Sequence, residues 1–189
     1  MKKRIFLTLL FVVFSASSVL CTEGVSVDGA LFGGTSLLDF KGESFGLKVV
    51  PVGGISLMSN FQTQGTLFYG LELSCLYSFR SNYNNYYYYD SYLSLSLMPR
   101  LGVSLKGRSL TYSFLVGVGG SHAFSGLFGK TYWIVSAGAG VYFPRFFPDG
   151  ILLSYSHSVV TNYPVFETIK VQAVVHIWQK KVNRKGEDL

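Results

Sequence analysis

Charged residues are scarce in this chain of 189 residues, because Lys, Arg, Asp and Glu together make up 14% and hydrophobic residues make up 49%. A water-soluble domain usually has about 25% charged residues. Cysteine is also scarce, and the two present, Cys21 and Cys75, exclude a disulfide framework and a cysteine-based metal cluster. Cys75 lies among apolar residues, and we interpret it as a small hydrophobic residue.

Long hydrophobic runs are missing beyond the first residues, so no later segment has the roughly 20 apolar residues that a transmembrane helix requires. At the start of the chain, residues 2–4 are basic, residues 5–14 are apolar and residues 15–18 are small. This order is typical of a secretory signal peptide. We therefore predict a signal peptide over residues 1–21, with cleavage near 18–21, and an exported protein without a helical anchor.

A strict alternation of apolar and polar residues marks the segment from Leu93 to Leu105. A period of two places alternate side chains on opposite faces of a strand. A nearly pure leucine face opposite a small polar face favours lipid on one side and a hydrated interior on the other. The apolar face contains Leu93, Leu95, Leu97, Leu101, Val103 and Leu105, and the other face contains Ser94, Ser96, Arg100, Gly102 and Ser104.

Similar segments recur about every twenty residues, as expected when each membrane-spanning strand needs about 9–11 residues plus a turn. We therefore predict an all-β fold, an eight-stranded antiparallel up-and-down transmembrane β-barrel over residues 22–178, followed by a basic periplasmic tail over residues 179–189. The expected strands are 24–35, 44–57, 66–79, 91–105, 110–121, 130–143, 150–159 and 167–178.

Five charged residues fall on the inward face of these strands: Asp28, Lys48, Glu72, Arg100 and Lys170. A Lys or Arg facing lipid at the midplane costs about 2–4 kcal/mol, so this placement favours a barrel. We predict an ion pair between Glu72 and Arg100, extended by the other three. Two interpretations stay open: a network that fills the lumen and sets the strand register, or the gate of a narrow pore.

Three further features lead to local expectations. Tyr77, Phe79 and Trp133 would lie at one membrane rim, where aromatic side chains tolerate both oil and water. Pro51 and Pro99 lie inside strands, where a missing N–H interrupts the ladder, so we expect β-bulges there. In the last strand the alternation predicts that Trp178 faces inward, on the same side as Lys170 and His176.

An even number of strands with both termini in the periplasm predicts short turns at 59–65, 106–109 and 144–149 on that side. The longest outer loop lies between the third and fourth strands and is rich in tyrosine. Tyrosine provides large contacts at low entropic cost, so this loop is a candidate recognition surface, although a low-complexity loop without a specific role is the alternative. The candidate residues are Tyr83, Tyr86, Tyr87, Tyr88 and Tyr89.

The architecture and the last hairpin, residues 151–158 with 171–178, resemble the small eight-stranded outer-membrane barrels of bacteria, the OmpA/OmpX/OmpW-like and opacity-protein group. The resemblance implies a location in the bacterial outer membrane with both termini in the periplasm. Members usually end on an aromatic residue as an assembly signal. Trp178 would fill that role here, but the basic tail that follows it departs from the pattern.

The resemblance and the patterning together predict a non-enzymatic role: limited, porin-like passage of small solutes, including hydrophobic ones. The alternative is a surface-exposed adhesion or envelope-integrity barrel with a plugged lumen. We expect outer-membrane lipids as partners, with small hydrophobic solutes or host surface ligands, and a monomer. Removing the basic residues 2–4 lowers the net charge from +6 to about +3, so charge does not indicate nucleic acid.

A third hypothesis is a lipid-modifying enzyme, for which His157 with Ser156 or Ser158 is the candidate pair. Since neighbouring strand residues point to opposite faces, His157 and Ser158 would not meet, and Glu167 is the one acidic residue nearby. His122 and His176 lack the spacing of metal ligands. We therefore expect no catalytic residues, no metal and no cofactor.

Overall fold

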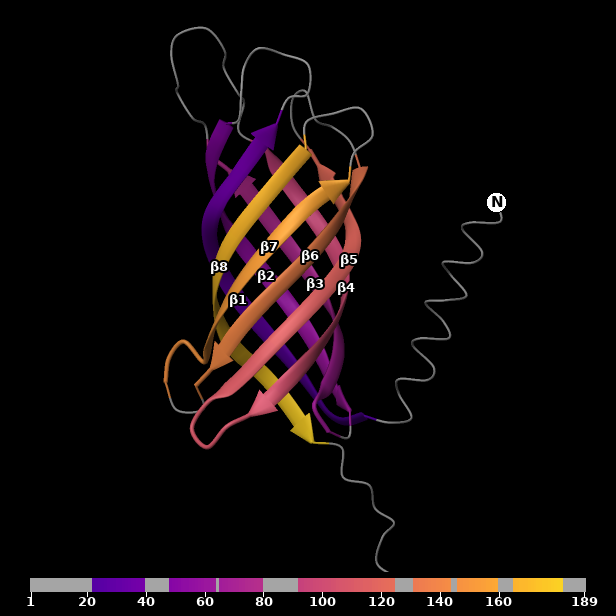
Figure 1. Ribbon diagram of the computed structural model, residues 1–189, viewed down its shortest axis with the longest axis vertical. Coiled ribbons are helices and arrows are strands. Elements are labelled where there is room, and N and C mark those ends of the chain that lie inside the picture. The colour runs from indigo at the N-terminus through magenta and orange to yellow at the C-terminus, as the bar shows by residue number, and fades with distance from the viewer. Residues whose placement is uncertain are drawn as a thin grey trace, which may run out of the picture.

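The chain forms a closed barrel in which eight antiparallel strands pair in sequence order and β8 pairs with β1, as predicted (Figure 1). The structure is a computed structural model that describes residues 22–39, 48–63, 65–79, 92–124, 131–143, 146–159 and 165–181. Among these residues, no helix is long and apolar enough to cross a membrane. The strands are β1 (Thr22–Asp39), β2 (Lys48–Thr63), β3 (Leu67–Ser78), β4 (Leu93–Lys106), β5 (Thr111–Ala123), β6 (Thr131–Tyr142), β7 (Gly150–Val159) and β8 (Val165–Lys181).

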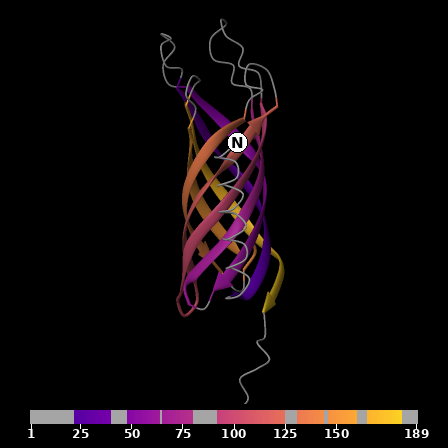
Figure 2. The same ribbon diagram turned by 90° about the vertical axis from the view of Figure 1, so that its right-hand side faces the viewer.

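The beginning of β1 and the end of β8 lie at the same end of the barrel, together with the short β4–β5 connection (Figures 1 and 2). We call this the terminal end, and the opposite end the loop end. The predicted signal peptide and residues 182–189 lie outside the described residues. The β8 strand continues to Lys181, so its last three residues belong to the segment expected to be a tail.

The β2 strand is longer than predicted, because it continues to Thr63 and leaves only a short connection to β3. The predicted turn at 59–65 is therefore wrong over most of its length. Gly65, with φ of 112°, makes the actual turn, and Thr63 Oγ1 donates a 2.8 Å hydrogen bond to the Leu67 carbonyl. Asn60 and Gln62 have turn-like composition, but they are polar because they line the barrel interior.

The two faces of the wall have opposite compositions, as the alternation predicts. Large apolar side chains cover the outside and are widely exposed, up to 69% for Leu31. Small and polar side chains face inward and are buried. Apolar atoms face outward because hydrocarbon, rather than water, is the expected solvent of this wall. Outward-facing examples from six strands are Leu31, Ile55, Leu73, Leu97, Phe114, Val116, Val118, Val171 and Ile177.

A β-bulge in β8 changes the direction of Trp178. Val27 pairs with Trp178 whereas Asp28 pairs with His176, so one extra residue, Ile177, lies between them in β8. The prediction that Trp178 faces inward is therefore wrong. Trp178 shares the outer face with its partner Val27 and is 48% exposed. Alternation alone misses this shift because a bulge moves every later side chain to the other face.

The prolines do not create bulges, contrary to the expectation. Pro51 stays in register with Thr35, and its carbonyl accepts a 3.0 Å hydrogen bond from the N–H of Phe79 at the loop end of the ladder. Pro99 stays in register with Leu71 of β3. Met98 and Pro99 have no paired residue in β5. The flanking pairs, Leu97 with Gly120 and Arg100 with Gly117, keep the same register. Each ladder thus loses hydrogen bonding locally without a change of register.

Two apolar clusters fill part of the interior. The cluster nearer the loop end contains Phe32, Val50, Val52, Leu76, Tyr92 and Ala123, with Tyr132 packed against it. The cluster nearer the terminal end contains Ala30, Met58, Leu115, Leu152 and Val174, with Phe68 and Tyr142 packed against it. The buried polar side chains lie among and between these clusters.

Neighbouring glycines of β1 test the tightness of the interior. A Cβ at Gly34 would overlap the backbone carbonyl of Ile169, whereas a Cβ at Gly33 would meet no atom within 4 Å. We expect Gly34→Ala to lower the free energy of unfolding by about 1–3 kcal/mol because backbone must move. Gly33→Ala, the matched control, should leave it nearly unchanged. Urea unfolding in lipid vesicles measures both, and equal values for the two variants would contradict this packing.

Candidate functional site in the barrel lumen

The carboxylate of Glu72 forms ion pairs with two cationic side chains at the centre of the barrel. Arg100 Nη1 lies 3.3 Å from Glu72 Oε2, and Lys170 Nζ lies 3.5 Å from Glu72 Oε1. These residues come from β3, β4 and β8, and all three side chains are almost completely buried. A buried charge requires a paired and hydrogen-bonded environment, so each member depends on the others.

Arg100 makes further contacts with β2. Its Nη2 donates a 2.9 Å hydrogen bond to Asn60 Oδ1, and its Nη1 lies 3.1 Å from Met58 Sδ. Gln172 Nε2 donates a 3.5 Å hydrogen bond to Glu72 Oε1. Lys170 Nζ also lies 4.9 Å from the centre of the Phe32 ring, in cation–π geometry.

Asp28 joins this network from β1. Asn60 Nδ2 donates a 2.6 Å hydrogen bond to Asp28 Oδ2, and His176 Nδ1 contacts Asp28 Oδ1. The backbone N–H of His176 donates a 2.7 Å hydrogen bond to Asp149 Oδ2, and its ring stacks on Tyr142. A connected set of polar side chains therefore extends from His176 to Lys170. We call it the charge network: Asp28, Asn60, Glu72, Arg100, Lys170, Gln172 and His176.

The structure brings together four of the five charged residues predicted to share the lumen: Asp28, Glu72, Arg100 and Lys170. Lys48 begins β2, but its side chain lies outside the described part of the chain. Reasoning from sequence missed Asn60 and His176 as members. The sequence pattern places Asn60 in a predicted turn, and it gives His176 no partner because Asp28 is 148 residues away in sequence. The tyrosine-rich segment, with Tyr83, Tyr86, Tyr87, Tyr88 and Tyr89, lies outside the described residues.

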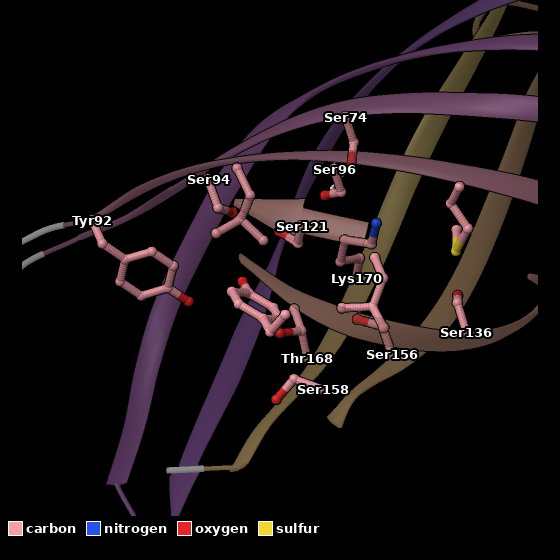
Figure 3. A pocket seen from close by; sticks show the side chains of 14 residues that line it. Ser74, Tyr92, Ser94, Ser96, Ser121, Ser136, Ser156, Ser158, Thr168 and Lys170 are labelled. Atoms are coloured by element: carbon pink, nitrogen blue, oxygen red, sulfur yellow. Dashed lines mark hydrogen bonds between the residues drawn. The ribbon is translucent and has the colours of Figure 1, made fainter. Parts of the chain in front are cut away.

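Two separate spaces adjoin the charge network. Towards the loop end lies a cavity of about 40 Å³, lined by Lys170 and many hydroxyl groups (Figure 3). Towards the terminal end lies an open vestibule of about 210 Å³, lined by Asp28, Asn60 and Arg100 among others. Tyr92 lines the first cavity beside Ser36, and burial raises the pKa of its hydroxyl to about 12, so Tyr92 stays neutral.

A second polar group lies on the outer wall. His157 and Glu167 are directly opposite each other on β7 and β8, with His157 Nδ1 3.4 Å from Glu167 Oε1 and both side chains about 40% exposed. Ser158 is buried and faces inward, as the alternation predicts. The neighbouring outward positions in the described strands are Val135, Tyr155 and Val159. This arrangement offers a paired imidazole without an adjacent serine hydroxyl, so the serine nucleophile of the enzyme hypothesis is not in reach.

Metal coordination has no candidate in the described residues, because no group of three or more His, Cys, Asp or Glu side chains converges there. Cys75 has a free thiol, and its side chain lies on the outer face of the wall in β3. The charge network contains all four buried charged side chains of the described residues: Asp28, Glu72, Arg100 and Lys170.

Comparison with solved structures identifies the fold. The chain is similar to the outer-membrane enzyme PagL, with a TM-score of 0.59 and 15% identity over 79% of this chain and 99% of that one. Neisserial surface protein A is similar with a TM-score of 0.51 and 12% identity over 80% and 99% of the two chains. OprG from Pseudomonas aeruginosa gives a TM-score of 0.50 and 9% identity over 83% and 97%. No protein-family model and no curated protein sequence matches the chain.

These neighbours are small outer-membrane barrels, so the chain has their fold, as its resemblance to that group implies. They include an enzyme and a surface protein by their own descriptions, so the shared fold does not decide between catalytic and non-catalytic roles.

Removing the central carboxylate tests how far the charge network stabilises the barrel. Glu72→Gln leaves Arg100 and Lys170 buried beside a neutral amide, so we expect the free energy of unfolding to fall by about 3–5 kcal/mol. Glu167→Gln, the matched control, removes a half-exposed partner on the outer wall and should cost about 1 kcal/mol or less. Urea unfolding in vesicles gives both values. Similar losses for the two variants would show that burial does not strengthen the central interactions.

Proposed function

We propose that the protein is an integral outer-membrane barrel with a closed lumen that holds its surface segments at the cell exterior, in adhesion or envelope integrity. The apolar outer wall supports a membrane location, since soluble proteins rarely expose so continuous an apolar surface. The shared fold with outer-membrane barrels supports the same location.

Aromatic side chains at both ends of the wall support a spanning orientation. Tyr77 and Phe79 pack edge to face near the loop end, with ring centres 5.2 Å apart, and Trp133 is exposed at that end. Trp178 and Tyr112 are exposed near the terminal end. Such rings favour the headgroup region, so aromatic side chains at both ends suit a barrel that spans the membrane. We place both termini in the periplasm because the longest connection, between β3 and β4, lies at the loop end, and outer loops are usually the longer ones.

The observation that carries the closed-lumen proposal is the filled cross-section of the barrel. Glu72, Arg100 and Lys170 meet in the middle, while Met58 and Leu152 pack beside them and are almost inaccessible. A barrel of eight strands has an interior just wide enough for side chains to fill. A filled interior favours a supporting role over free passage of solutes.

Gated passage of small solutes is the second candidate. It is favoured by the position of the Glu72–Arg100 pair between the vestibule and the hydroxyl-lined cavity, where a rearrangement would join two existing spaces. An enzymatic role has weaker support, because the described strands place no serine beside His157 on the outer wall.

Planar-bilayer recordings separate the closed barrel from the gated pore. Because apolar side chains fill the interior beside the ion pair, we expect wild type, Glu72→Gln and Arg100→Met all to show only leak current. Heat-dependent mobility on gels verifies that each variant is folded before recording. A steady current in wild type contradicts the closed lumen, and current in the two variants alone supports the gate.

Trimming the long outer loop tests the surface role. Deleting residues 82–90 removes most of the tyrosine-rich segment, which suits recognition because tyrosine provides contact area at low entropic cost. We expect binding of protein-containing vesicles to a matrix-coated surface to fall at least tenfold. Arg108→Gln, in the β4–β5 connection at the opposite end, is the control and should bind as wild type. Undiminished binding after trimming would exclude recognition by this loop.

A further inference from the structure

The hydroxyl-lined cavity, here called the serine cavity, is enclosed by side chains from six strands (Figure 3). Eight of its lining residues have hydroxyl groups on small side chains, and two tyrosines, Tyr92 and Tyr132, lie towards the loop end. A hydroxyl donates one hydrogen bond and accepts others, so its preferred partner depends on the surrounding charge. The eight residues are Ser74, Ser94, Ser96, Ser121, Ser136, Ser156, Ser158 and Thr168.

The charge next to the serine cavity is positive. Lys170 lines the cavity and is only 6% exposed. Lys170 Nζ lies 3.5 Å from Oε1 of its carboxylate partner Glu72. Glu72 also pairs with Arg100, so two cations share one carboxylate. Asp28, the other buried carboxylate of the described lumen, lies on the vestibule side and contacts His176 and Asn60. A buried cation with a shared counter-charge favours an additional negative partner.

The hydroxyl groups of the cavity differ in their surroundings. Ser74 bonds to Ser96, and Thr168 bonds to Ser36. Ser136 and Ser156 are paired residues of β6 and β7, and both side chains line the cavity beside Lys170. Ser136 is 2% exposed, so it is a buried polar side chain that lines the cavity. A buried hydroxyl is stabilised by a hydrogen-bond acceptor, and an anion in the cavity would supply one.

The size of the serine cavity limits what that partner is. About 40 Å³ is room for roughly three particles that each need about 10–15 Å³, as a water molecule does. Organic anions with many more than three heavy atoms do not fit in this space. A metal cation is disfavoured because the Lys170 ammonium group would repel it, whereas a small anion is attracted to the ammonium group and accepts hydrogen bonds from hydroxyl groups.

We propose that the serine cavity binds a small monovalent inorganic anion of the halide class, held by the Lys170 ammonium group and by the Ser136 and Ser156 hydroxyls. The anion supplies the second negative partner that Lys170 lacks and stabilises the closed lumen. Since a ligand that binds only the folded state raises stability with its concentration, halide should stabilise the barrel.

Urea unfolding of the full chain, refolded in zwitterionic detergent, tests this site. Sodium chloride and sodium gluconate are compared at equal ionic strength, because gluconate is too large to enter. We expect the unfolding midpoint to rise with chloride and not with gluconate. Ser136→Ala should weaken the apparent chloride affinity about tenfold, and Lys170→Met should abolish the chloride effect. Ser104→Ala, in the vestibule, is the matched control and should retain it.

The Ser136→Ala variant keeps the test decisive if Lys170→Met does not fold. A bromide-containing crystal provides a second measurement, in which we expect an anomalous peak inside the serine cavity within contact of Lys170 Nζ. Equal midpoints in chloride and gluconate, or water without bromide in the cavity, would overturn the proposal. A chloride effect that persists in Ser136→Ala and Lys170→Met would also overturn it, because the anion would then act elsewhere on the protein.

Discussion

The carboxylate of Glu72 is the group on which the organisation of the lumen depends. It lies between the guanidinium group of Arg100 and the ammonium group of Lys170, and it joins side chains of β3, β4 and β8. The outer wall cannot take these charges, because it faces hydrocarbon in the proposed membrane setting. The interior accepts them only because opposite charges meet there. Closure of the barrel and neutralisation of its charge are therefore coupled.

This coupling explains how the interior is divided. The charge network occupies the middle, apolar clusters fill the space beside it, and the remaining volume is split between the serine cavity and the vestibule. A lumen built in this way suits a rigid support better than an open channel. The barrel of PagL is described as an enzyme and that of neisserial protein A as a surface protein, so chemistry is added to this fold by particular side chains rather than by the barrel.

The sequence was sufficient for the features that depend on local alternation. The leucines of β4, the serines opposite them and the inward placement of Glu72 and Arg100 follow from the period of two. Alternation gives the wrong face for Trp178, because the extra residue of the β8 bulge turns this side chain from the inside to the outside. It also fails at Asn60, whose polar side chain suggests a turn but points into the lumen and bonds to Asp28. The prolines were misjudged for a related reason, since a missing N–H can be tolerated by omitting hydrogen bonds without shifting the register.

By itself the sequence determined that the chain is an eight-stranded barrel with an apolar outside and a polar inside, because each strand repeats the same two-residue pattern. The tertiary structure alone decided which inward side chains meet. His176 and Asp28 are 148 residues apart in sequence and become partners only when β8 closes against β1. The offset between neighbouring strands sets the depth of each side chain, and that offset is a property of the closed sheet rather than of any strand.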